Sequence, residues 1–316
     1  MRVVALAGGV GGAKLAAGLY GVLPPDHLSV VVNTGDDLDL YGLRVCPDLD
    51  TVLYTLSGLA DPVQGWGIAG DTFATLDLLG RYGVPTWFRL GDRDLATHIR
   101  RSELLRGGAR LTAVTDGLAR ALGVRAQLLP MCDEPVVTRV RTPDGVLDFQ
   151  DYFVRRRHGD PVLGLEFAGI DAARVTDEVR DAVAGATAIV LCPSNPFVSV
   201  APILAVPGLR DLLRAGAPIV AVSPIVGGQA LRGPAADMLA ALGHEVSALG
   251  VARLYQGLAH GFVLDEEDSA LAPAVEALGM RALVTPAVMR DLDDRRRLAA
   301  AVLSFVGDAR SLGTGS

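Results

Sequence analysis

The hydrophobic positions of this chain fall into two alternating patterns. Short, continuously apolar runs rich in Val and Ile occupy residues 2–7, 28–33, 186–192 and 217–222. Such runs are typical of parallel strands that are covered on both faces. Segments with apolar residues at helical spacing follow them, which predicts helices over residues 12–22, 50–59, 70–82, 94–106, 111–122, 207–215, 230–242 and 294–306. The alternation predicts an α/β fold with a doubly wound, Rossmann-like parallel sheet.

Residues 124–168 have a different pattern. The sequences VVTRVR and VLDFQDYFV alternate apolar and polar residues on either side of Thr142-Pro143-Asp144-Gly145, a turn signal. This predicts an antiparallel hairpin inside a smaller inserted α+β segment. No internal repeat or Ser/Gly-rich linker is visible, so we expect residues 1–316 to form a single α/β domain with an insertion at 124–168.

Composition narrows the class of protein. Half of the 316 residues are hydrophobic and the formal net charge is −7, which argues against sequence-independent nucleic-acid binding because no basic surplus is available for phosphates. No run reaches the roughly 18 to 20 apolar residues of a membrane span, and the first apolar run is too short for a signal-peptide core. We expect a soluble, cytoplasmic protein. The three cysteines are far apart, so neither a disulfide framework nor a structural zinc site is indicated.

A glycine-rich turn follows the first predicted strand and opens into a helix. Gly9, Gly11 and Gly12 would leave backbone N–H groups and a positive helix end at the carboxyl edge of the sheet, an arrangement that favours phosphate. Lys14, in the same loop, is the only lysine among 29 basic residues. The loop matches neither the dinucleotide fingerprint nor the P-loop, so a tight turn without a ligand stays the alternative.

The stretch after the second predicted strand is rich in aspartate, and four of these residues are candidates: Asp36, Asp37, Asp48 and Asp50. The ends of the first two strands should face one crevice, which would place these carboxylates near bound phosphate. Carboxylates beside phosphate need a cation between them, and Mg²⁺ suits that pairing. The alternative is that Asp48 or Asp50 only caps the helix that follows.

Three further segments carry candidate side chains. Arg89 could make forked hydrogen bonds to an anionic or carbonyl-rich ligand, and His98 lies one helical turn after Asp94. The turns Cys192–Pro196 and Ser223–Gly228 end two buried strands and offer Ser194, Asn195, Ser223 and Gly228 at the same sheet edge. Simple structural roles stay open for each: a surface arginine, a buried histidine and ordinary turns.

In order along the chain, these segments resemble the 2-phospho-L-lactate transferases of the CofD/FbiA family, which assemble the deazaflavin coenzyme F-420. The matching motifs are GGVGGAK, NTGDD, PDLDTVLYTLSG, WGIAGDTF, LGDRDLATHIRR, LLPMCDEPVVT, FQDYFVRRR, PSNPFVSVAPILAVPG and SPIVGGQALRGPA. Each motif alone is unspecific, whereas the ordered set, from residue 7 to about residue 236, is highly specific.

The resemblance implies a magnesium-dependent transfer. A phospholactyl or phosphoenolpyruvyl group would pass from a guanosine diphosphate-linked donor to the ribityl hydroxyl of the deazaflavin Fo, releasing GMP. By similarity, Asp50 and Arg89 would contact Fo, and Asp36, Asp37 and Asp48 would serve the metal. The donor's phosphates and nucleotide would be held by Gly9, Gly11, Gly12, Lys14, Ser194, Asn195, Ser223 and Gly228.

The chemistry expected is an in-line displacement at phosphorus, in which positioning and charge neutralisation supply most of the acceleration. Asp36, Asp50 and His98 are the catalytic candidates. We expect small-molecule substrates and no nucleic-acid or membrane partner. We also expect a homodimer, because dimers are the commonest oligomers of soluble proteins. The motifs do not distinguish the phosphoacids.

Two other functions compete with the transferase. A nucleotide-sugar-binding regulatory protein of the YvcK-like type would share the glycine-rich turn and the doubly wound core, but would leave PDLDT and LGDRDLATH without a role. A nicotinamide-dependent dehydrogenase is disfavoured by the broken dinucleotide fingerprint.

Overall fold

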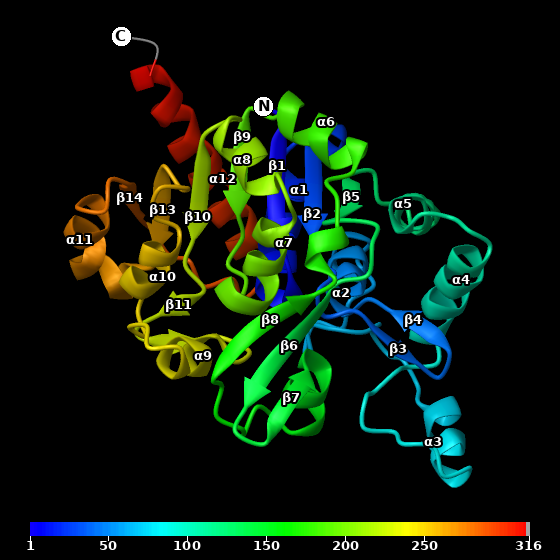
Figure 1. Cartoon of the computed structure of the whole chain (residues 1–316). Coiled ribbons are helices and arrows are strands. Elements are labelled where there is room, and N and C mark those ends of the chain that lie inside the picture. Colours follow the sequence, from blue (N-terminus) through cyan, green and yellow to red (C-terminus); the bar gives the residue numbers. More distant parts are fainter. Residues whose placement is uncertain (314–316) are drawn as a thin grey trace.

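The main sheet has seven strands, all parallel, in the order β14-β13-β10-β9-β1-β2-β5 (Figure 1). The computed structural model describes the backbone of residues 1–313 and the side chains of residues 1–307. The strands are β1 (Val3–Ala7), β2 (Leu28–Val32), β5 (Gln127–Pro130), β9 (Ala188–Leu191), β10 (Ile219–Val222), β13 (Gly261–Leu264) and β14 (Arg281–Val284). The chain winds outward in both directions from β1 and β9, so the predicted doubly wound α/β fold is confirmed.

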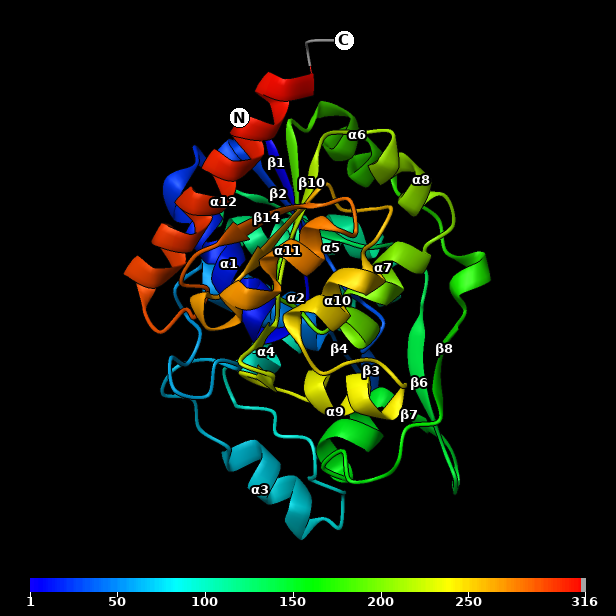
Figure 2. The ribbon, with the colours of Figure 1, turned by 90° about the vertical axis from the view of Figure 1, so that its left-hand side faces the viewer.

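Helices pack on both faces of this sheet, whereas α3 lies away from it, below the carboxyl edge in Figure 2. The helices are α1 (Gly9–Val22), α2 (Pro47–Leu56), α3 (Ala74–Arg81), α4 (Asp94–Arg106), α5 (Leu111–Ala121), α6 (Asp177–Gly185), α7 (Ala201–Ala205), α8 (Leu209–Arg214), α9 (Ala235–Ala241), α10 (Ala248–Leu254), α11 (Ala272–Glu276) and α12 (Leu292–Gly313). Alternate residues of β1 point to opposite faces: Val3 and Ala5 join the core under α1, α2 and α12, and Val4 and Leu6 join the core on the other face. This division explains why the strands are apolar throughout.

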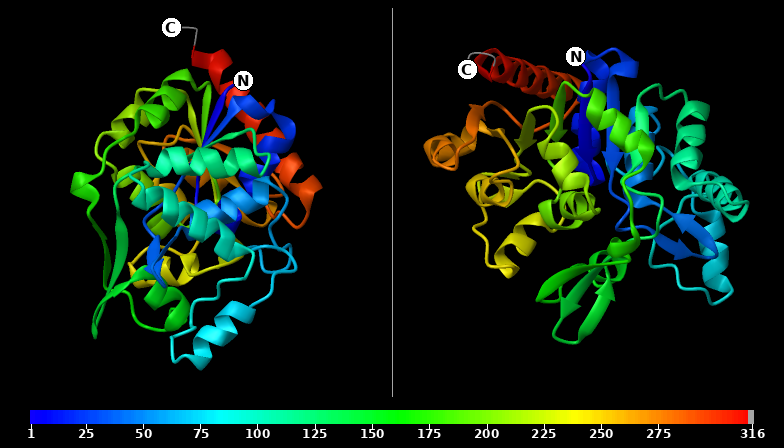
Figure 3. Two further views of the ribbon diagram at one scale, coloured as in Figure 1. Left: turned by 90° about the vertical axis from the view of Figure 1, so that its right-hand side faces the viewer. Right: turned by 45° about the horizontal axis from the view of Figure 1, so that its top comes forward.

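Short antiparallel elements lie beyond the carboxyl edge of the main sheet. The strands β6 (Val137–Thr142), β7 (Gly145–Asp148) and β8 (Gly164–Ala168) form one small sheet, which projects from the body in Figure 3. Two-stranded ribbons are formed by β3 (Leu38–Leu40) with β4 (Leu43–Val45) and by β11 (Ile225–Val226) with β12 (Gln229–Ala230). These elements surround the edge at which an α/β sheet binds ligands.

The hairpin predicted within residues 124–168 is confirmed for its first part only. β6 and β7 pair antiparallel around the turn, but Asp151–Arg155 forms a π-helical turn in place of a continuing strand. Phe149, Tyr152 and Phe153 have helical spacing, and the rings of Phe149 and Phe153 stack 5.4 Å apart. The stretch also includes β5, which is an edge strand of the main sheet.

Other boundaries differ little from the predicted ones. The helix predicted at 94–106 has those bounds, and α1 begins at Gly9, three residues before its predicted start. The predictions missed β5, β13 and β14 of the main sheet and the helices α6, α7, α10 and α11. Within residues 1–313, none of the helices combines the length and the apolar character that a bilayer crossing requires.

Candidate functional site

The sheet changes winding direction between β1 and β9, and the turns that follow these strands are in contact. The backbone N–H of Gly8 donates to Ser194 Oγ at 3.0 Å. A side chain at Gly11 would collide with the carbonyl oxygen of Pro193, and one at Gly12 would collide with Ser194 Oγ. These glycines therefore let α1 approach the turn after β9, and a ligand contact for Gly9, Gly11 or Gly12 stays a prediction.

Asn33 joins two of the predicted aspartates at the end of β2. Its Nδ2 donates to Asp36 Oδ1 at 3.2 Å and to Asp48 Oδ2 at 3.0 Å. The other oxygen of Asp48 accepts the N–H of Gly9 at 2.6 Å, and Gln150 Nε2 donates to Asp36 Oδ2 at 3.3 Å. The structure thus brings Asp36 and Asp48 together at the start of α1, as the spacing predicted.

Burial raises the pKa values of three of these carboxyls. Burial and then the charge of Asp48 raise the pKa of Asp36 well above its ordinary value. Burial raises the pKa of Asp48 to about 6 and that of Asp37 to about 7, although hydrogen bonds from Asn33 and from Cys46, respectively, oppose the shift. Ionised carboxylates are therefore costly here unless a cation joins them.

This donor set fits a divalent cation that is shared with a ligand. The buried Asp37 Oδ1 has no hydrogen-bond partner, which leaves an oxygen available. Over the described residues, no three His, Cys, Asp or Glu side chains come together to hold a metal ion by themselves. Mg²⁺ is usually held by one or two carboxylates with phosphate oxygens and water, so phosphate would complete such a site.

Asp50, two residues after Asp48 on α2, belongs to a network of buried ion pairs and hydrogen bonds. Arg101 pairs with both of its oxygens, through NH1 at 3.0 Å and through NH2. His98 lies between two carboxylates, with Nδ1 3.6 Å from Asp50 Oδ2 and Nε2 3.1 Å from Asp94 Oδ1. Tyr54 Oη donates to Asp94 Oδ1 at 2.6 Å. All five side chains are buried, so Asp50 and His98 do not face solvent.

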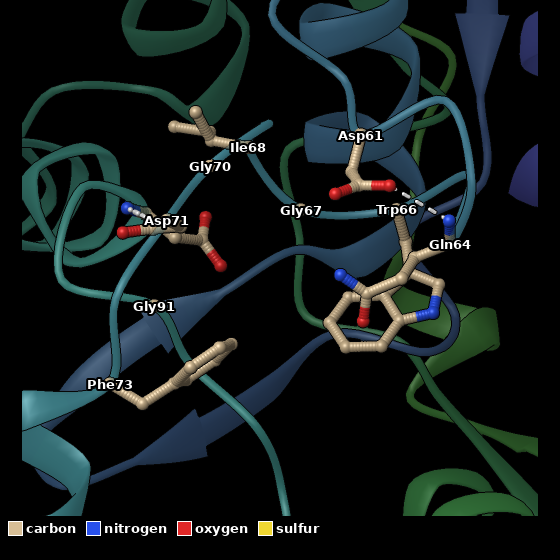
Figure 4. Close-up of a pocket in the computed structure, with 10 residues that line it drawn as sticks. Asp61, Gln64, Trp66, Gly67, Ile68, Gly70, Asp71, Phe73 and Gly91 are labelled. Atoms are coloured by element: carbon tan, nitrogen blue, oxygen red, sulfur yellow. Dashed lines mark hydrogen bonds between the residues drawn. The ribbon is translucent and has the colours of Figure 1, made fainter.

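Asp94, the last residue in this network of buried polar contacts, lines a cavity of about 90 Å³. We call it the aromatic cavity, and Figure 4 shows it. Trp66 and Phe73 lie around it together with the carboxylates of Asp61 and Asp71. The guanidinium of the exposed Arg89 stacks on the ring of Phe73, 4.1 Å from its centroid. The cavity therefore offers flat apolar surfaces, acceptors and a nearby cation, which suits a planar heteroaromatic ligand.

A second cavity, of about 130 Å³, shares the lining residue Asp61 with the aromatic cavity. Lys14, Arg232 and Arg295 line it with Val10 of the first turn of α1, and we call it the cationic cavity. Lys14 Nζ donates to the carbonyl oxygen of Met289 at 2.8 Å. Burial, and then the charges of Arg295 and Arg232, lower the pKa of Lys14. The lone lysine thus belongs to a cationic group that the sequence did not reveal.

The remaining candidates take part in the turns that carry them. Asn195 Oδ1 accepts from the N–H of Phe197 at 2.9 Å, and Ser223 Oγ donates to the carbonyl oxygen of Ile225 at 2.7 Å. Gly228 has a positive φ of 75° in the β11–β12 ribbon. The structure places these residues after β9 and β10 as expected, and their contact with a nucleotide stays a prediction.

Several site residues were not found as candidates from the sequence. Trp66, Asp71 and Phe73 lie in WGIAGDTF, which the sequence analysis used only as a motif of the family resemblance. Arg101 is one of many arginines in the sequence and was not singled out. Arg232 and Arg295 come from segments far apart in sequence, so only the fold brings them to Lys14.

Comparison with known proteins finds similarity over nearly the whole chain. Residues 3–296 match the family described as 2-phospho-L-lactate transferase CofD. The chain is 43% identical to the phosphoenolpyruvate transferase of Streptomyces griseus, over 98% of this chain and 100% of that one. It is 44% identical to the 2-phospho-L-lactate transferase of Methanosarcina acetivorans, over 96% and 98%.

A solved structure shares the fold. The structure of a UPF0052 family protein, BH3568, from Bacillus halodurans matches with a TM-score of 0.64 and covers 96% of this chain and 98% of that one. Because its sequence identity is 15%, this likeness supports the fold alone.

Proposed function

The chain belongs to the 2-phospho-L-lactate transferase CofD family and is an enzyme that transfers a phosphate-containing group; we propose that it moves a phospholactyl or phosphoenolpyruvyl group from a guanosine diphosphate-linked donor to the deazaflavin Fo and releases GMP. Relatives named for either phosphoacid are similar to this chain to nearly the same degree, at 43% and 44% identity. The proposal therefore covers both donors.

One relationship supports the proposal: contacts link the aspartates of α2 to residues in or next to two chemically different cavities. Asp48 accepts a hydrogen bond from the backbone N–H of Gly9, and the next residue, Val10, lines the cationic cavity. Asp50 is linked through His98 to Asp94 in the aromatic cavity. A planar acceptor in one cavity and an anionic donor at the other would have the acidic cluster between them.

The acceptor suits the aromatic cavity. The tricycle of Fo is flat and carries carbonyl groups, so it would pack against Trp66 and Phe73, and Arg89 is within reach to donate to it. Asp50 would act on Fo indirectly, by holding His98 and Asp94 in place, because Arg101 occupies its oxygens.

The donor suits the switch point between β1 and β9. Its phosphates would lie at the positive end of α1 near Gly9, Gly11 and Gly12, with the nucleoside toward Ser194, Asn195, Ser223 and Gly228. Asp36, Asp37 and Asp48 would hold Mg²⁺ together with donor oxygens, and the bound metal would neutralise charge that develops on the phosphates.

The reaction is then a displacement at phosphorus. The ribityl hydroxyl oxygen forms the new P–O bond, the bond to the GMP oxygen breaks, and the hydroxyl proton leaves for a nearby acceptor. Asp36 would take that proton only through an oxygen that Mg²⁺ leaves free, and His98, whose ring is 1% exposed, would act through Asp94. Holding both substrates in line would supply most of the rate enhancement.

The decisive test is product formation. The purified chain is incubated with Fo, Mg²⁺ and either the guanylylated phospholactate or the guanylylated phosphoenolpyruvate, and mass spectrometry identifies the deazaflavin product and GMP. We expect both products to appear together with at least one donor. Absence of a coupled deazaflavin with both donors would refute the proposal.

We also propose a homodimer and a cytoplasmic location. Light scattering of the purified chain tests the first, and fractionation of the source cells tests the second.

A further inference from the structure

The cationic cavity gathers three positive charges from three distant segments. Lys14 comes from α1, Arg232 follows β12, and Arg295 lies in the first turns of α12. The only carboxylate that lines this cavity is Asp61, and its Oδ1 already accepts the N–H groups of Val63 and Gln64 at 2.8 and 2.9 Å. The cavity therefore has an excess of positive charge.

These cations form no salt bridge within the part of the chain that the structure describes, although the charge of Asp291 acts on Arg295 from beyond salt-bridge distance. No carboxylate oxygen there lies within 4.0 Å of the charged nitrogens of Lys14, Arg232 or Arg295. The buried Nε of Arg295 has no hydrogen-bond partner. Lys14 Nζ donates one of its three N–H groups to the carbonyl oxygen of Met289, so two N–H groups remain available to a ligand.

The first turn of α1 adds to the positive electrostatic potential of the cationic cavity. Val10 lines the cavity, and the N–H groups at the start of a helix have no partner within the helix. The N–H of Gly9 is taken by Asp48, so it is not available to a ligand in this cavity. Three separate cations beside a helix start match a ligand with several phosphoryl oxygens better than one with a single carboxylate.

We propose that Lys14, Arg232 and Arg295 form the binding site for the diphosphate of the guanosine-linked donor. This inference rests on the proposed function and adds Arg232 and Arg295 to it. Arg232 also donates to the carbonyl oxygens of Val63 and Gln64, and Gln64 lines the aromatic cavity. The diphosphate would thus lie next to the segment that forms the acceptor site.

The test compares anion binding by the whole chain and by matched variants. Calorimetry measures the dissociation constants of GDP and of inorganic pyrophosphate for the wild type, Arg295→Gln, Arg295→Lys, Arg232→Gln and the control Arg296→Gln. Arg296 is the next residue on α12, does not line the cavity, and pairs with Asp293 at 3.7 Å. Thermal melting checks that each variant is folded.

We expect Arg295→Gln and Arg232→Gln to weaken both ligands by about tenfold or more, because each removes a charge-assisted hydrogen bond. Arg295→Lys should retain part of the affinity, and Arg296→Gln should retain all of it. In turnover, Arg295→Gln should raise the KM for the donor and leave the KM for Fo unchanged.

The outcomes separate the two claims. If product forms but the wild type binds neither anion, or the variants bind both as tightly as the wild type, the diphosphate site is wrong and the proposed function stands. If no product forms while pyrophosphate binding still depends on Arg295 and Arg232, the anion site stands and the proposed function is wrong.

Discussion

Arg101 and Asp50 form a buried ion pair, in which the guanidinium reaches both oxygens of the carboxylate. The two residues come from α4 and α2, so the pair ties the helix that carries the acidic cluster to the helix that carries His98 and Asp94. Removing the cation would leave a buried carboxylate without compensation, which is far costlier than losing a surface pair.

We expect Arg101→Ala to lower the free energy of unfolding by about 3–5 kcal/mol. Chemical denaturation measures the change. Arg100→Ala is the control, since Arg100 is exposed and pairs with the exposed Glu103; it should cost about 0–1 kcal/mol. Equal effects of the two substitutions would show that the buried pair does not stabilise this region.

The order of apolar runs was enough to predict the centre of the sheet but not its edges. β1, β2, β9 and β10 are long or fully apolar and were predicted. β14 is only half-buried, with Arg281 at its start, so its pattern does not identify a strand. β13 is as long as β9 and β10, but His260 and Asp265 flank it, so its apolar run ends with the strand, whereas the runs at 186–192 and 217–222 extend beyond β9 and β10.

The position of the acidic residues could be predicted from the sequence, whereas the cavities beside them could not. The spacing predicted that Asp36 and Asp48 lie near the glycine-rich turn at the carboxyl edge of the sheet, but it did not predict that Asn33 joins them. The cavities could not be predicted, because Arg232 and Arg295 reach Lys14 only after α9 and α12 have packed. Helical spacing places Arg101, and not Arg100, on the same face of α4 as Asp94 and His98, but the polar residues of that face do not show that it is buried.

The aromatic cavity should bind the acceptor by stacking. Phe73→Ala removes a ring from the cavity and also the surface on which Arg89 lies, so we expect the KM for Fo to rise roughly 5- to 30-fold, equivalent to about 1–2 kcal/mol. Steady-state kinetics with varied Fo measures it. Tyr82→Ala is the control, because Tyr82 is 72% exposed and outside the cavity. An unchanged KM for Fo in Phe73→Ala would place the acceptor elsewhere.

The acidic cluster should make stability depend on pH and on Mg²⁺. In the unfolded chain an aspartate has a pKa of about 3.9, whereas burial raises the pKa of Asp48 to about 6 and that of Asp37 to about 7. Between these values the folded state binds more protons than the unfolded state, so metal-free protein should lose stability as the pH rises from about 4 to about 7.

Melting temperatures measured across this range, with and without Mg²⁺, test that dependence. We expect Mg²⁺ to raise the melting temperature more at pH 8 than at pH 5.5, and Asp37→Asn to flatten the metal-free profile. A Mg²⁺ effect that does not change with pH would separate the metal from these carboxylates.

The glycine-rich turn should tolerate no side chain where α1 meets the turn after β9. A methyl group at Gly11 would meet the carbonyl oxygen of Pro193, so Gly11→Ala should destabilise the protein by about 1–3 kcal/mol. Gly117 lies within α5 with no neighbouring atom within 4 Å of an added Cβ, so Gly117→Ala should stabilise the protein by roughly 0.5–1 kcal/mol. Urea denaturation distinguishes the signs, and a neutral Gly11→Ala would mean that the turn can move away.

The most direct measurement is a crystal structure of the protein with Fo and GDP bound together. We expect the Fo ring against Trp66 and Phe73, the diphosphate among Lys14, Arg232 and Arg295, and the aspartates of α2 between the two ligands. Ligands bound on surfaces that the acidic cluster does not separate, or too far apart for the ribityl hydroxyl to reach the phosphates, would contradict the arrangement proposed for the transfer.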